Sequence, residues 1–378
     1  MSILIGADFV PTETNENYFI KGDADYLLGK ELKDILSAAD YRIFNLELPL
    51  VDEVSPISKC GPNLVAKTNA INLYSKIGVD LFTIANNHIY DQGLKGFKST
   101  LDMLKSRGIN YVGGGENLKV AAQPFIFRYK ESKVGIYACV EHEFSIASET
   151  SPGANPFETL ESYDHVEALS RECDYVIVLY HGGKEHYRYP SPNLQKYCRK
   201  FIDKGANLVI CQHSHCIGCE EKYHKGTIVY GQGNFLFDHS SNECWSTGLL
   251  IEIDIKSEKI DYIPLIKKNE TVRKANEEES RIILTAFQKR SSEIQNKDFI
   301  KENYLRFSEE LIDGYLWGMS GKNSSILFRV LNRISGYRFY KRYVNKLYRK
   351  KTLLALLNNI ECEAHREIII QGLKAKKN

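Results

Sequence analysis

The sequence predicts an α/β fold in residues 1–268 and an appended helical region in residues 269–378. Two observations favour this division. Short apolar segments typical of strands alternate with segments of helical periodicity up to about residue 266, as in layered α/β folds. From about residue 270 glycine becomes sparse and apolar residues recur at helical spacing. The segments 249–255 and 259–266 look like paired antiparallel strands, which predicts a mixed sheet or a sandwich of two sheets.

The individual elements follow from apolar periodicity along the chain. Strands are predicted where short apolar runs occur, at 3–7, 41–47, 80–85, 109–112, 133–140, 175–180, 207–211 and 226–230. Helices are predicted where apolar residues recur every three to four positions, at 31–39, 69–77, 94–107, 160–171 and 193–204. Helical spacing also covers 272–294, 297–317 and 350–375 in the appended region.

Composition limits the function classes. The chain of 378 residues is 43% hydrophobic and 26% charged, which is ordinary for a globular protein with a core. Its net charge of +2 gives no global attraction for nucleic acid, so a nucleic-acid partner is not expected.

The nine cysteines include one C-x-x-C, formed by Cys216 and Cys219, and no second pair completes a four-cysteine zinc site. We interpret these thiols as buried and reduced.

The expected location is the cytoplasm. The first residues lack the basic and apolar regions of a signal peptide, and no apolar run approaches the ~20 residues of a membrane helix. No phosphate-binding Walker sequence is present, so ATP binding of the P-loop type is not expected.

Metal-competent side chains follow five of the predicted strands. Sites in open α/β sheets form beyond the carboxyl ends of strands, so these side chains are expected to meet. Taken alone, each motif has a structural alternative: a lone aspartate after a strand is often a turn or cap residue, and a single histidine is often buried for packing. The residues are Asp8, Asn45 and Glu47, Asn86 to His88, His181, and His213 with His215.

The residue types predict the metal. Carboxylate, asparagine oxygen and neutral imidazole suit Mn, Fe or Zn better than a soft thiolate site. About six such ligands are enough for two divalent ions that share a bridging carboxylate, and a single ion is the alternative. Two ions can hold both the attacking and the leaving oxygen of a phosphoryl transfer, and a further histidine could protonate the leaving group.

The motifs together resemble the CapA family of capsule and poly-gamma-glutamate synthesis proteins. The matching blocks occur in the order of that family over about residues 1–265. They are Gly6–Asp8, Asn45–Leu50, Ala85–Gly93, Gly113–Leu118, His181–Glu185, Gln212–His215 and Gly233–Asp238.

This family is similar to the calcineurin-like metallophosphatases. The resemblance implies a four-layer αββα sandwich with a metal site, and a hydrolase acting in capsule or cell-surface polymer synthesis. Its substrate would be a small molecule or polymer with phosphate or carboxylate groups, and capsule-synthesis proteins are possible partners. The implied metal ligands are Asp8, Glu47, Asn87, His181, His213 and His215; the implied catalytic residues are His88, Asp91 and Glu185; the implied substrate-binding residues are Asn45, Asn86 and Asn234.

The sequence departs from the phosphatase pattern in three places. Asp8 is followed by Phe9 and Val10 rather than by a histidine two positions later, Glu47 replaces an aspartate, and Gln212 replaces a glycine or histidine. These differences leave a second hypothesis open. In it the chain is an accessory protein with little or no activity that binds the polymer or a synthase partner.

The appended region contains a basic and aromatic segment, residues 333–351. One interpretation is a surface for a polyanion, a nucleotide-linked precursor or an anionic membrane. The other is a solvated helical face whose aromatic residues pack inward.

Overall fold

The computed structural model describes residues 2–237, 242–322, 325–336 and 338–377. Asp238 and Tyr337, which belong to segments singled out above, lie outside the described residues. The chain divides into two compact units, Met1–Ile300 and Lys301–Asn378. The expected boundary near residue 268 falls in a strand of the first unit, which also includes the following helix, α8 (Glu277–Glu293).

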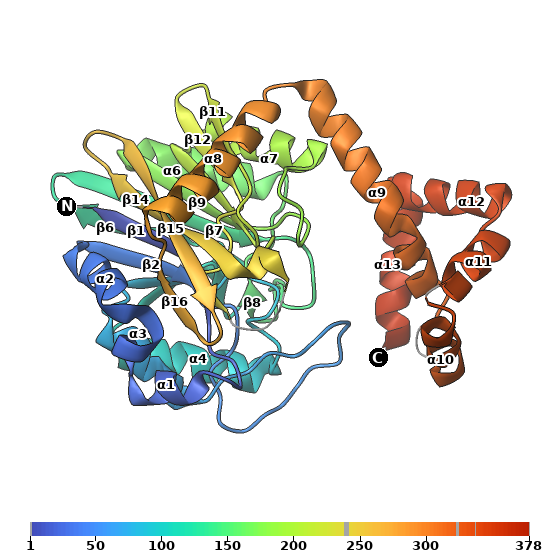
Figure 1. The fold of residues 1–378 in the computed structure, drawn as a ribbon, viewed down its shortest axis with the longest axis horizontal. Helices are drawn as coiled ribbons and strands as arrows, with labels where there is room; N and C mark the ends of the chain where they lie inside the picture. Colours follow the sequence, from blue (N-terminus) through green and yellow to red (C-terminus); the bar gives the residue numbers. More distant parts are fainter. Residues whose placement is uncertain (1, 238–241, 323–324, 337, 378) are drawn as a thin grey trace. The chain divides into compact units, whose positions relative to one another are not determined.

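The first unit contains two main sheets (Figure 1). The larger has the order β16-β15-β14-β1-β2-β3-β4, with β13 paired to β1. Its central strands β1 to β4 are parallel, and β14 to β16 are antiparallel. The bounds are β1 Ile3–Val10, β2 Tyr41–Asn45, β3 Leu81–Thr83, β4 Asn110–Val112, β13 Leu236–Phe237, β14 Thr247–Asp254, β15 Lys259–Lys268 and β16 Thr271–Lys274.

The smaller sheet has the order β11-β12-β10-β9-β7-β6. Its four inner strands are parallel, and the edge strands β11 and β6 are antiparallel to their neighbours. The bounds are β6 Phe125–Tyr129, β7 Ser132–Val140, β9 Tyr175–His181, β10 Leu208–Gln212, β11 Glu220–Tyr223 and β12 Gly226–Tyr230. A separate short ladder pairs β5 (Gly114–Gly115) with β8 (Gly153–Ala154).

Helices cover the outer faces of the sheets, which gives the predicted αββα sandwich. Residues of β9 alternate between two cores: Ile177 and Leu179 face the core shared with the larger sheet, while Val176 and Val178 face helices α6 and α7. Helices α1 to α4 pack on the larger sheet (Figure 1). The bounds are α1 Glu16–Lys21, α2 Ala24–Ala38, α3 Ile71–Lys76, α4 Gly93–Ser106, α5 Leu118–Ala121, α6 Glu161–Glu172 and α7 Pro192–Asp203, with short 3-10 helices at Thr68–Ala70 (η1) and Glu243–Ser246 (η2).

The prediction of one helix over 272–294 is wrong at its start. Residues Thr271–Lys274 form β16, which pairs with β15, and the helix begins only after Asn276. Asn276 and Glu279 form a reciprocal capping box, which fixes the start of α8. Phe287 of α8 then packs against Tyr262 of β15, with ring centroids 4.9 Å apart.

The second unit is helical, as predicted for the appended region. Helix α9 (Lys297–Met319) enters it and is followed by α10 Ile326–Ile334, α11 Arg338–Leu347, α12 Lys350–Glu361 and α13 Glu363–Lys377. The single helix predicted over 350–375 is interrupted at Cys362, whose backbone is extended. Among the described residues, no helix is both long and apolar enough to cross a membrane.

Candidate metal centre

The carboxyl ends of the parallel strands in both sheets meet at one buried site. Asp8 lies within β1 and Asn45 ends β2, whereas His181 ends β9. The other predicted ligands lie in the loops that follow β2, β3 and β10. The predicted metal ligands are all at most 9% exposed; they are Asp8, Glu47, Asn87, His181, His213 and His215.

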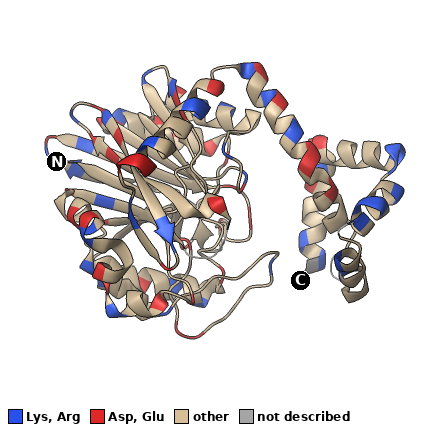
Figure 2. Ribbon diagram, in the orientation of Figure 1, with Lys and Arg blue, Asp and Glu red and all other residues tan. Residues whose placement is uncertain are grey.

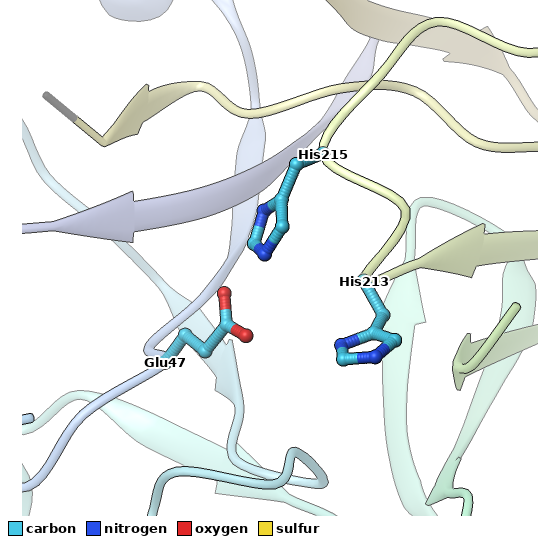
Figure 3. A group of neighbouring side chains, drawn as sticks. All are labelled: Glu47, His213 and His215. Atoms are coloured by element: carbon cyan, nitrogen blue, oxygen red, sulfur yellow. The ribbon is translucent and has the colours of Figure 1, made fainter. Parts of the chain in front are cut away.

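Three of these side chains form a compact ligand group. Glu47, His213 and His215 each offer one ligand atom, and these atoms all lie within 4.8 Å of one another. Figure 3 shows the carboxylate of Glu47 directed toward the two imidazole rings. The backbone of His213 and His215 has φ of 91° and 53°, a left-handed conformation that histidine adopts uncommonly. This turn after β10 brings both imidazoles toward the same space.

Unsatisfied carboxylate oxygens indicate that a cation fits here. Among the described residues, Asp8 Oδ2 and both carboxylate oxygens of Glu47 are buried without a hydrogen-bond partner. His215 Nδ1 lies 3.3 Å from Asp8 Oδ2 and His181 Nε2 lies 3.2 Å from Glu47 Oε1, which is ion-pair distance only. Burying an ionised carboxylate costs several kcal/mol unless it is paired or bound to a metal. The donors present, carboxylate and imidazole, suit Mn, Fe or Zn.

Two histidines and an asparagine extend the cluster from the smaller sheet. His181 Nε2 lies 3.0 Å from Asn87 Oδ1, and His213 Nδ1 lies 3.1 Å from His181 Nε2. The amide of Asn87 also donates to Glu143 Oε2 at 3.4 Å. The six predicted ligands therefore lie in one connected group, although their role as ligands remains a prediction.

The three asparagines predicted to bind substrate are buried and hold other site residues. Asn45 donates to Asp8 Oδ1 at 2.7 Å, and Asn86 donates to Asn45 Oδ1 at 2.9 Å. Asn86 Oδ1 also accepts from the backbone N–H groups of residues 88 and 89, so it fixes the turn after β3. Asn234 Oδ1 lies 2.8 Å from His215 Nδ1. These contacts indicate a positioning role, and contact with substrate remains a prediction.

Burial and neighbouring charges set the protonation of the histidines. Burial, together with the charges of His181 and His215, holds the pKa of His213 well below its usual range, so His213 is neutral, as a metal ligand must be. Burial would also lower the pKa of His215, but Asp8 and Glu47 outweigh it and raise that pKa to about 9. Burial would raise the pKa of Asp8, and His215 outweighs it and lowers that pKa. A cation bound here would replace the proton of His215.

A second group of side chains lies beside this cluster. His88 Nδ1 is 2.7 Å from Asp91 Oδ2, and Asp91 also pairs with Lys59, whose side chain is only 2% exposed. The backbone N–H of Leu64 donates to the same carboxylate oxygen at 2.7 Å. Asp91 therefore orients His88 and fixes the loop that carries Lys59. Glu185 lies apart: its side chain is 44% exposed and its ion-pair partner is the adjacent Lys184, so its catalytic role remains a prediction.

A cavity of about 560 Å³ opens beside the site. Its lining includes Val10, two residues beyond Asp8, and Leu48, which follows Glu47. Phe237 also lines it, and the Phe237 ring lies 5.8 Å from the ring of His215. The walls are mainly apolar near the strands, with Glu13, Glu16 and Lys67 among the polar lining residues.

Three residues around the cluster were not predicted from the sequence. Lys267 on β15 is buried and donates to the backbone carbonyls of Asn234 and Thr247, at 3.1 Å each. Trp245 stacks on His215, with centroids 4.3 Å apart. Lys59 lies in a loop without periodic pattern, so no signal marked it. Lys267 could have been found, because it shares the inward face of β15 with Leu265 two positions earlier.

Comparison with known proteins identifies the family of this chain. Residues 3–239 match the family described as bacterial capsule synthesis protein PGA_cap. The chain belongs to this family. The match covers the two-sheet unit up to β13 and includes every predicted site residue. The resemblance to capsule and poly-gamma-glutamate synthesis proteins is thereby confirmed.

Curated relatives carry related descriptions. The capsule biosynthesis protein CapA of Bacillus anthracis is 27% identical over 249 residues, which cover 59% of this chain and 61% of the relative. The PGA biosynthesis protein CapA of Bacillus subtilis is 25% identical over 213 residues, covering 55% and 56%. A Mycobacterium tuberculosis protein described as a probable polyglutamine synthesis accessory protein is 28% identical over 169 residues, covering 41% and 44%. The aligned region is less than two thirds of each relative.

Solved structures match this chain at low sequence identity and with TM-scores below 0.5. A phosphatase of Mycoplasma pneumoniae is 15% identical with a TM-score of 0.43, covering 71% of this chain and 94% of its own. A 5'-nucleotidase precursor of Thermus thermophilus is 13% identical with a TM-score of 0.35, covering 76% and 58%.

Proposed function

We propose that this chain is a metal-dependent phosphohydrolase that acts in capsule or cell-surface polymer synthesis, on a poly-gamma-glutamate or polysaccharide route. One observation carries the proposal: three buried ligand atoms from Glu47, His213 and His215 lie within 4.8 Å of one another, beside carboxylate oxygens that lack hydrogen bonds among the described residues. Such a group has the donor types and the unsatisfied charge that a divalent ion requires.

The residues that would hold one or two ions of Mn, Fe or Zn are Asp8, Glu47, Asn87, His181, His213 and His215. A divalent ion supplies positive charge to phosphoryl oxygens and lowers the pKa of a water that it binds. Glu47 is suited to be shared between two ions, because neither of its carboxylate oxygens has a hydrogen-bond partner among the described residues. Asn45 and Asn86 keep Asp8 oriented through their amides.

His88 is the proposed proton donor to the leaving group. Its Nδ1 faces Asp91 Oδ2 at 2.7 Å, so Nε2 is the ring nitrogen that can exchange a proton with a substrate. Asp91 keeps the ring in this orientation and balances the charge of Lys59. A substrate with a phosphate or carboxylate group would place that group at the ions, and the adjoining cavity of about 560 Å³ would take the rest of the molecule.

A second candidate is an accessory protein that binds polymer or a synthase partner with little or no turnover. The observation that favours it is Val10, a buried apolar residue at the position where a histidine would complete the phosphatase pattern. The relative in Mycobacterium tuberculosis is itself described as a probable polyglutamine synthesis accessory protein.

The test is metal content by elemental mass spectrometry on untagged protein prepared without chelator. The double variant His213→Ala, His215→Ala is compared with His142→Ala, His365→Ala, which removes two histidines outside the cluster. We expect Mn, Fe or Zn near stoichiometry in the wild type and the control, and its loss in the cluster variant. A phosphoester substrate screen on the loaded protein then separates the two candidates. Protein that binds no metal even after Mn is added would refute both a hydrolase and a residual metal site.

A further inference from the structure

The helical unit has a small core of its own. Leu316 and Trp317 of α9 and Val344 of α11 are buried together, and aromatic side chains of α10 and α11 pack around them. The ring of Phe328 lies 5.6 Å from those of Phe339 and Tyr343, and the side chain of Asn332 accepts from the backbone N–H of Tyr340 at 2.7 Å. Phe339, Tyr340, Tyr343 and Tyr348 of the basic segment therefore face inward, and α10 turns its Phe328 and Asn332 side toward α11.

The opposite side of α10 is apolar and exposed. Five aliphatic residues recur there at helical spacing, so they form one continuous stripe along the helix. Their exposed fractions are 71% for Ile326, 65% for Leu327, 47% for Val330, 37% for Leu331 and 79% for Ile334. Arg329 and Arg333 flank this stripe and are also exposed. A solvated stripe of this kind is unfavourable unless something covers it.

The sequence on both sides of this stripe carries charge of one sign. Residues 314–360 contain no aspartate or glutamate, although the whole chain is nearly neutral. Figure 2 shows this segment of α10, α11 and the start of α12 with basic residues only. The ten cations in the segment are Lys322, Arg329, Arg333, Arg338, Lys341, Arg342, Lys346, Arg349, Lys350 and Lys351.

We propose that α10 is a membrane-surface anchor: its apolar stripe inserts into the outer part of an anionic lipid layer, and the surrounding cations contact lipid headgroups. An apolar stripe beside clustered Lys and Arg is the pattern of helices that lie in the membrane interface. At nine residues α10 is suited to lie in the interface and is too short to span the bilayer. The inference is independent of the proposed catalysis.

Charge and apolar area favour an anionic lipid surface over a second copy of the chain or a dissolved polyanion as the partner of this stripe. A second copy of the chain docked on the same face would bring the flanking Arg329 and Arg333 of both copies to one interface, and residues 314–360 offer no carboxylate to pair with them. A dissolved polyanion would satisfy the cations but would leave the five aliphatic residues in water. An anionic lipid surface satisfies both features at once.

The test is co-sedimentation of the full chain with phosphatidylcholine vesicles that contain or lack phosphatidylglycerol. The double variant I326S, I334S removes the two most exposed residues of the stripe. The matched control L160S changes an aliphatic residue that is 76% exposed in the first unit. We expect binding to anionic vesicles that weakens with added salt, and a loss of partitioning of about 10-fold or more in the double variant but not in the control. Circular dichroism verifies that both variants keep their helices.

Three outcomes would overturn the proposal. Wild-type protein could fail to bind anionic vesicles. The double variant could bind anionic vesicles as well as the wild type does, which would mean that the cations act alone, as they would toward a soluble polyanion. Finally, the stripe could prove to be a self-association surface. In that case sedimentation velocity would show a wild-type dimer that becomes monomeric in I326S, I334S, and the wild type would not bind vesicles.

Discussion

Buried Lys267 makes the stability of the protein depend on pH in a way that one substitution should reveal. Burial lowers the pKa of Lys267 from 10.5 to about 7, with the charge of Asp8 opposing this shift. Between these two pH values the unfolded chain holds a proton that the folded protein has released, so stability rises with pH in this range. The free-energy cost of the buried ammonium is about 4 kcal/mol at pH 7 and about 1 kcal/mol near pH 9.5.

The substitution Lys267→Met removes this cost, together with two hydrogen bonds to the carbonyls of Asn234 and Thr247. Each carbonyl left without its donor costs about 1–3 kcal/mol, at either pH. As pH rises from 7 to about 9.5, the unfolding free energy of the wild type should therefore increase by about 3 kcal/mol relative to that of the variant.

Urea denaturation at both pH values measures this shift, and Lys268→Met, at the exposed neighbouring position, is the control. An unchanged difference between Lys267→Met and wild type at the two pH values would refute the reasoning, because the buried amine would then keep an ordinary pKa.

Two further predictions concern the site. Asp91→Asn leaves the ammonium of Lys59 buried without its carboxylate, so we expect a loss of about 3–5 kcal/mol in unfolding free energy. The double variant Asp91→Asn, Lys59→Met should recover part of this loss in urea denaturation, because it removes the unpaired ammonium. Equal stability of the single and double variants would contradict the pairing. A chelator should lower the melting temperature of wild-type protein, because a ligand at about 100 times its Kd stabilises by about 2.7 kcal/mol. The same chelator should leave Glu47→Gln nearly unchanged; a comparable decrease in both proteins would place the stabilising ion elsewhere.

The layered fold and the buried cluster could be predicted because both depend on strong local patterns. The strands of the central sheets are nearly continuous apolar runs, and the polar residues that end them meet because parallel strands share an edge. His213 and His215 illustrate this: their position after a predicted strand placed them at the shared edge, and their left-handed backbone turns both imidazoles toward Glu47.

Elements whose formation depends on tertiary pairing were harder to predict. The edge strands β6 and β11 are only partly buried and carry mixed side chains, and β16 forms because β15 offers it an open edge. Lys59 could not be predicted for the same reason, because it lies in a loop without a periodic pattern and Asp91 of a distant segment supplies its acceptor. Lys267 differs, because the alternation along β15 places it on the inward face with Leu265.

The distribution of the ligands between the two sheets has a consequence for assembly. Asp8 and Glu47 come from the larger sheet, whereas His181, His213 and His215 come from the smaller one. A partly folded chain with only one sheet formed would hold either carboxylates or imidazoles, and would bind a divalent ion weakly. An ion bound at the proposed site would then hold the two sheets together, and the affinity for that ion would depend on how firmly the sheets are docked.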